Sequence, residues 1–268
     1  MELFYRTYGD GHPLIIIHGL YGASDNWTTV ARALSKYFKV YTIDQRNHGL
    51  SPHSDEMNYQ AMKEDLREFI ETHNLEKVSL LGHSMGGKTA MFYATEFPQK
   101  VSNLIVADIS PRTYGTVPEE TPQYQLHCSM IKAMKKVDLS TATSRNDVDK
   151  ALQEDISMAR VRQFLLKNLQ RNEDNSFRWK INLDALGNHL MDVLDGIDPA
   201  PYEHGNGITA FPALFLRGEH SDYIEKEDEA LIQTIFPYAK LVTIENAGHW
   251  VHAEKPEAFI KAIRDFIF

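Results

Sequence analysis

The sequence of 268 residues contains a single cysteine, Cys128. One thiol cannot form a disulfide within the chain, so the class of small, disulfide-stabilised secreted domains is excluded. Its neighbours, QLHCSM, match no recognised nucleophile motif. We therefore interpret Cys128 as a small, semi-buried apolar residue.

Long apolar runs are also missing. The longest aliphatic run is Leu14–Ile17, much shorter than the roughly 20 residues that a membrane-spanning helix needs. The first ten residues, MELFYRTYGD, lack the basic start and apolar stretch of a signal peptide. We expect a soluble, cytoplasmic protein that has no membrane partner.

Basic residues are too few to balance the acidic ones. With 28 Lys and Arg against 37 Asp and Glu, the formal net charge is −9, which argues against nucleic acid as a partner. Metal-ligand spacing is lacking as well: His249 and His252 lie three apart without a third ligand, and H-E-x-x-H is absent. We expect no metal and no other cofactor.

What the sequence does contain is an alternation of strand-like and helix-like segments over residues 1–111 and 206–268. Short aliphatic runs such as PLIIIHG, KVSLLG and VSNLIVAD are typical of strands buried on both faces. Between them, apolar residues recur at helical spacing. This order predicts an α/β core with a mostly parallel sheet, whose strands end at one edge where ligands bind.

Residues 112–205 have a different pattern, because aliphatic strand-like runs disappear there. Apolar residues at helical spacing predict helices instead: Met158, Val161, Phe164, Leu165 and Leu169, and then Leu183, Leu186, Leu190, Val193 and Leu194. We predict a helical insertion bounded by linkers rich in Pro, Gly and Asp.

The segment GHSMGGKT, which begins at Gly82, satisfies two motifs at once. As G-x-x-x-x-G-K-T it would be a phosphate-binding loop formed by Gly82, Gly87, Lys88 and Thr89, with Asp108 as a magnesium ligand. This interpretation explains one short pattern and one strand-end acid.

As G-x-S-x-G, the same segment would be a nucleophile elbow that presents Ser84. This interpretation also explains two distant segments. In IIIHGLYG, the N–H of Leu20 would join that of Met85 in an oxyanion hole, and in AGHWVHAEKP, His249 would be the general base. We therefore favour the elbow.

Together, HGLYG, DQRNHGLS, GHSMGGK, ADISP and AGHWVHAEKP resemble the α/β-hydrolase superfamily and, within it, the bacterial YbfF-type serine esterases. The resemblance covers residues 13–112 and 210–268. It implies an α/β-hydrolase fold, with residues 112–205 as a cap over the active site. In that arrangement Asp44, Arg46 and His48 would build a structural loop, and His18 would shape the oxyanion loop.

Two residues could complete a triad as its acid. Asp222 follows the strand-like run ALFLRG, the usual place across the superfamily, but the usual spacing after the glycine falls on Ser221. The resemblance to YbfF-type esterases implies that Asp108 holds the histidine instead. We favour Asp108 and keep Asp222 as the alternative. The other histidines, such as His127, His189 and His204, are expected to be exposed.

A serine at the elbow indicates acyl transfer, whereas dehalogenases and epoxide hydrolases of this superfamily carry Asp there. We expect hydrolysis of small carboxylic esters or thioesters through an acyl-enzyme. A carbon–carbon bond hydrolase and a slow-turnover ligand receptor on the same fold remain open.

Overall fold

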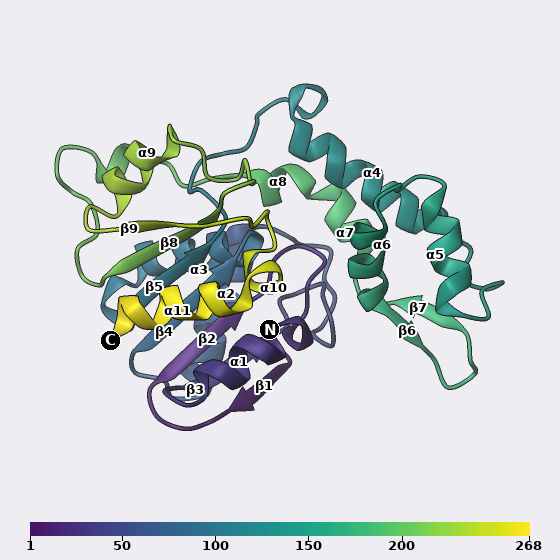
Figure 1. Cartoon of the computed structure of the whole chain (residues 1–268), viewed down its shortest axis with the longest axis horizontal. Helices are drawn as coiled ribbons and strands as arrows, with labels where there is room; N and C mark the ends of the chain where they lie inside the picture. The colour runs from purple at the N-terminus through teal and green to yellow at the C-terminus, as the bar shows by residue number, and fades with distance from the viewer.

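The computed structural model describes all 268 residues. Its centre is a seven-stranded sheet of order β1-β3-β2-β4-β5-β8-β9 (Figure 1). Only β1 is antiparallel to its neighbour. The strands are β1 Tyr5–Tyr8, β2 Pro13–Ile17, β3 Lys39–Ile43, β4 Val78–His83, β5 Val101–Ala107, β8 Ala213–Gly218 and β9 Lys240–Ile244. The predicted, mostly parallel α/β sheet is confirmed.

Helices cover both faces of this sheet, because alternate strand residues point to opposite sides. Ile15 and Ile17 pack in the cluster that includes α2 (Tyr59–Thr72), α3 (Met85–Glu96) and α9 (Asp228–Ile235). Leu14 and Ile16 pack in the cluster of the other face, with α1 (Thr28–Leu34) and α11 (Pro256–Ile267). A short helix, α10 (Val251–Glu254), precedes α11.

Residues 112–205 form a group of helices beside this core, most of it at the right of Figure 1. The helices are α4 Pro122–Lys136, α5 Arg145–Gln153, α6 Ala159–Leu165, α7 Leu183–Asn188 and α8 Leu190–Leu194. One part of the helical prediction was wrong. Leu169 begins strand β6 (Leu169–Arg171), which pairs with β7 (Phe177–Trp179) in an antiparallel hairpin. These strands have only three residues each, too few for an alternating pattern to be visible.

The 112–205 segment shares a hydrophobic cluster with the core. Its own buried residues, such as Leu165 and Leu186, pack in one cluster with Leu20, Tyr21 and Met85 of the loops above the sheet. The segment is thereby held over the edge at which the parallel strands end. No helix of the structure has both the length and the apolar character that a bilayer crossing requires.

Candidate active site

Ser84 occupies the turn between β4 and α3 in a strained conformation, with φ 52° and ψ −124°. The turn is possible because the residues two positions before and two positions after Ser84 are glycines. A Cβ on Gly82 would lie 2.2 Å from the carbonyl oxygen of Gly86, and one on Gly86 would lie 2.3 Å from that of Ile17. A strained strand-to-helix turn of this kind presents its serine hydroxyl above the sheet edge.

His249 lies in the loop that follows β9, and its Nδ1 is 2.8 Å from Oδ2 of Asp108, which directly follows β5. Asp108 is fully buried. Its Oδ1 accepts a hydrogen bond of 2.8 Å from the backbone N–H of Gly218, and the hydroxyl of Ser221 donates to its Oδ2. The carboxylate therefore accepts from three donors. One of them is the imidazole of His249, whose ring is oriented by this bond.

Asp222, the alternative acid, is exposed. Its backbone carbonyl accepts a hydrogen bond of 3.2 Å from Arg112, and its carboxylate makes no hydrogen bond to His249. Ser221, where the usual spacing placed the acid, donates to Asp108 instead. The structure brings His249 together with Asp108 and not with Asp222.

His83 supports the loop that carries His249. Its Nε2–H donates to the carbonyl oxygen of His249 at 2.8 Å, and its ring packs against those of His249 and His252, each with centroids 4.7 Å apart. Burial is the main reason that the pKa of His83 lies well below its usual value. A neutral His83 therefore fixes the backbone of His249.

The loop after β2 contains Leu20 between two anchored neighbours. His18 accepts the N–H of Gln45 at Nε2 (3.0 Å), so its Nδ1 carries the proton and donates to the carbonyl oxygen of Gly19 (2.8 Å). On the other side, the N–H of Tyr21 donates to Nε2 of His48. The N–H of Leu20 has no acceptor in the protein.

The second donor proposed for the oxyanion hole is the N–H of Met85. Met85 is the first residue of α3, where backbone N–H groups have no intrahelical partner. Both predicted donors are thus unpaired groups, one on the loop after β2 and the other at the start of α3, directly after Ser84.

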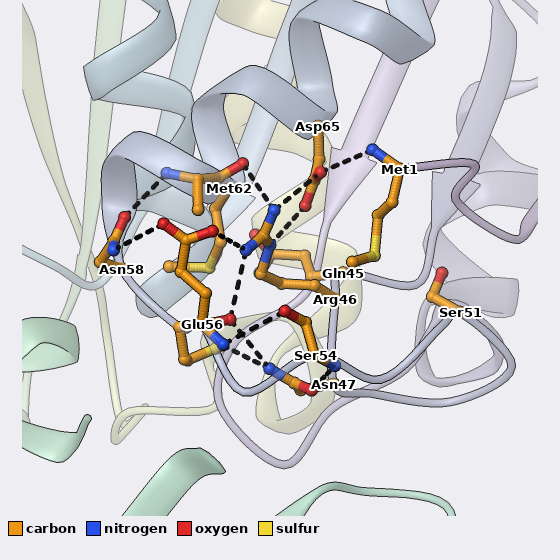
Figure 2. A network of polar contacts seen from close by, with 12 residues as sticks. Met1, Gln45, Arg46, Asn47, Ser51, Ser54, Glu56, Asn58, Met62 and Asp65 are labelled. Atoms are coloured by element: carbon orange, nitrogen blue, oxygen red, sulfur yellow. Dashed lines mark hydrogen bonds and ion pairs between the residues drawn. The ribbon is translucent and has the colours of Figure 1, made fainter. Parts of the chain in front are cut away.

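The DQRNHG segment has a structural role, as the sequence predicted. Arg46 is buried and pairs with both carboxylate oxygens of Asp65 at 2.6 and 3.0 Å (Figure 2). It also reaches Glu56 at 3.2 Å. Burial lowers the pKa of His48 to about 3, so His48 stays neutral and accepts the N–H of Tyr21. The contact of His48 thereby holds the loop that contains Leu20.

Ser84 and His249 line one cavity of about 240 Å³ beneath the 112–205 segment. Its lining is largely apolar: Leu20, Tyr21, His83, Ser84, Leu126, His127, Met130, Met158, Val161, Phe164, Leu165, Tyr223, His249 and Trp250. The space can hold a small apolar ligand next to the serine hydroxyl. A larger surface depression of about 570 Å³ between β9 and α11 contains none of these residues.

The expectation that His127 is exposed was wrong. It lies on α4 in the wall of this cavity, and its Nδ1 is enclosed without a hydrogen-bond partner. No sequence pattern marks His127 as a cavity residue, because the inward face of α4 depends on how the segment packs on the core. His204 is exposed as expected, and His189 is half-buried.

Comparison with known proteins identifies the family to which the chain belongs. The model of the alpha/beta hydrolase fold family matches residues 12–256. The chain belongs to the α/β-hydrolase family. It is 41% identical over 100% of its length to a Xenopus laevis protein named sn-1-specific diacylglycerol lipase ABHD11, of which it covers 84%. It is 33% identical over 95% of its length to esterase YbfF of Escherichia coli, of which it covers 92%.

Among solved structures, a marine microorganism esterase superposes on this α/β-hydrolase with a TM-score of 0.93. The two are 49% identical, and the match covers 99% of each chain. The predicted resemblance to YbfF-type esterases is therefore confirmed at the level of the family.

Lys88 does not serve a phosphate site in this α/β-hydrolase. Its side chain is fully buried, and its Nζ donates to the carbonyl oxygens of Arg112 (2.6 Å), Leu194 (3.4 Å) and Asp195. These acceptors lie at the two ends of the 112–205 segment. Burial lowers the pKa of Lys88 to about 7, while its ammonium group lies over the ring of Tyr114 at 4.7 Å. The lysine of the apparent phosphate loop thus ties the segment to α3.

Replacing Lys88 by Met is expected to lower the free energy of unfolding by about 2 kcal/mol. The stem would still pack, but the carbonyl oxygens of Arg112 and Asp195 would lose their only donor and that of Leu194 one of its two donors. The cost of burying a charge offsets part of that loss. Thermal unfolding followed by circular dichroism would show a melting temperature about 4–8 °C lower. Lys132→Met, at an exposed lysine of α4, is the control and should leave it unchanged. An unchanged melting temperature in Lys88→Met would contradict a stabilising role for these bonds.

Proposed function

We propose that this protein is a serine esterase that hydrolyses small carboxylic esters or thioesters with a triad of Ser84, His249 and Asp108. One observation carries the proposal. Ser84, strained on its turn, shares a cavity with His249, which is hydrogen-bonded to the buried Asp108. Carboxylic-ester hydrolysis is also the activity for which the esterase relatives are named.

In the proposed mechanism, His249 takes the proton of Ser84 as its hydroxyl oxygen attacks the acyl carbon. Because Nδ1 of His249 is held by Asp108, the other ring nitrogen is the one that is free to take this proton. The N–H groups of Leu20 and Met85 stabilise the negative charge that develops on the carbonyl oxygen. His249 then returns the proton to the leaving alcohol, and water hydrolyses the acyl-enzyme by the same route.

We propose that residues 112–205 act as a cap on a core of residues 1–111 and 206–268. Half of the cavity lining comes from this segment: Leu126, His127, Met130, Met158, Val161, Phe164 and Leu165. Of these residues, only His127 has a side chain that forms conventional hydrogen bonds. The segment therefore excludes water from the acyl group and limits its length.

The test is covalent labelling with a fluorophosphonate, which reacts with an activated serine hydroxyl. We expect one probe per chain, attached to Ser84 and identified by peptide mass spectrometry. The p-nitrophenyl acetate and butyrate esters should be hydrolysed with higher kcat/KM than the long-chain esters, because the cavity is only about 240 Å³. Folded protein that neither reacts with the probe nor turns over these esters would rule the proposal out. A single burst of product without turnover would instead indicate the receptor alternative.

A further inference from the structure

A polar pair stands in an otherwise largely apolar wall of the cavity. Nε2 of His127, on the cap helix α4, lies 3.5 Å from the hydroxyl of Tyr223, in the loop after β8. This is long for a hydrogen bond, and it is the hydroxyl's one polar contact. Nδ1 of the same imidazole is buried without any partner. The pair therefore has hydrogen-bonding capacity that the protein itself leaves largely unused.

The position of the pair relative to His249 indicates which part of a substrate it would meet. The ring of Tyr223 stacks on that of His249, with centroids 3.9 Å apart and an interplanar angle of 23°. In the proposed mechanism His249 protonates the leaving oxygen, so the leaving alcohol lies against His249. The pair consequently faces the alcohol side of the scissile bond.

The charge state of the pair restricts the group that it can bind. Burial, together with the nearby His249, lowers the pKa of His127 to about 4, and burial raises the pKa of Tyr223 above its usual value. Both groups are neutral near pH 7. A neutral imidazole and a phenol can each donate and accept, which matches an alcohol hydroxyl, whereas a carboxylate or ammonium group would be buried here without a counter-charge.

We propose that His127 and Tyr223 form a specificity subsite for a neutral hydroxyl group on the leaving alcohol of the ester. The inference rests on the proposed esterase function and adds to it a class of substrate, the partial esters of polyols. A bound hydroxyl would bridge the two side chains in place of their long direct contact. A plain alkyl alcohol would leave them with only that long direct contact.

The test compares two esters that have the same acyl group and three-carbon alcohols, glyceryl monobutyrate and n-propyl butyrate. The measured quantity is the ratio of their kcat/KM values, obtained by pH-stat titration. In His127→Leu and in Tyr223→Phe this ratio should fall by about 5–10-fold relative to the unmodified enzyme, the effect of one lost hydrogen bond. The intrinsic reactivities of the two esters cancel, because each variant is compared with the unmodified enzyme on the same pair.

Two further variants separate this role from general damage to the site. His127→Gln keeps a donor and an acceptor and should retain most of the ratio. The double variant His127→Leu/Tyr223→Phe should lower it little more than either single change, because the two residues would act as one site. An unchanged ratio in both single variants, with both esters still hydrolysed, would overturn the subsite and leave the esterase proposal standing. If the unmodified enzyme hydrolysed neither ester, both proposals would fall together.

Discussion

Replacing Ser84 by Ala is expected to lower the turnover of p-nitrophenyl butyrate by on the order of 10³-fold or more. Without the hydroxyl there is no nucleophile for the acyl carbon, and His249 has no proton to accept. The two other members of the proposed triad cannot compensate, since triad residues act as a unit. Initial rates on purified protein, measured at saturating substrate, give the comparison directly.

The loss should be confined to chemistry. Ser84→Ala keeps a small residue in the turn, so circular dichroism and melting temperature should match those of the unmodified protein. Ser129→Ala, which removes an exposed hydroxyl on α4, is the matched control and should retain full activity. Undiminished turnover in Ser84→Ala would show that another group carries the reaction and would remove the basis of the mechanism.

Replacing Asp108 by Asn should lower kcat by on the order of 10³–10⁴-fold, while Asp222→Asn should stay within about twofold. The amide has no charge to stabilise the imidazolium that forms when His249 takes the serine proton. It can also donate to Nδ1 and so favour the wrong tautomer. Asp222 is exposed and its carboxylate makes no hydrogen bond to His249, so its charge is far less important for the reaction.

Asp108→Asn and Asp222→Asn form a matched pair, because each removes one carboxylate charge at the same edge of the sheet. Each must first be shown to fold, since Asp108 also accepts from Gly218 and Ser221. Ser221→Ala adds a graded comparison. It removes one donor to Asp108 but leaves the charge, so the loss in kcat should be far smaller than that of Asp108→Asn. A large loss of kcat in Asp222→Asn, together with an unchanged kcat in Asp108→Asn, would assign the role of the acid to Asp222.

The strands of the core could be predicted because each carries a compact signal of its own. Leu14–Ile17 is a run of four aliphatic residues with no polar interruption, and all four are buried. The hairpin of β6 and β7 gave no such signal, because three-residue strands such as Leu169–Arg171 show no periodicity. Its pairing depends on contacts within the 112–205 segment.

The exposure of His127 was predicted wrongly for a related reason, and the same reason left the role of Lys88 undetermined by the sequence. Whether a polar side chain on an amphipathic helix faces water or a cavity depends on the surface that the helix meets. Lys88 fits a phosphate-loop pattern in the sequence, yet it binds carbonyl oxygens up to 107 positions away. The local sequence pattern cannot distinguish a lysine that binds phosphate from one that binds carbonyl oxygens, because these acceptors come from other segments of the chain.

The sequence by itself determined the position of Ser84 on its turn and the two candidate acids, because each belongs to a short pattern of residues that are neighbours in the chain. Several such patterns in order also indicated the α/β-hydrolase fold. Only the tertiary structure decided that Asp108, and not Asp222, meets the imidazole of His249. That contact spans 141 positions and follows from the order of β5, β8 and β9 in the sheet. A shift of one residue, from Ser221 to Asp222, turns a side chain from the buried carboxylate toward solvent, and only the packed strands determine which side chain points inward.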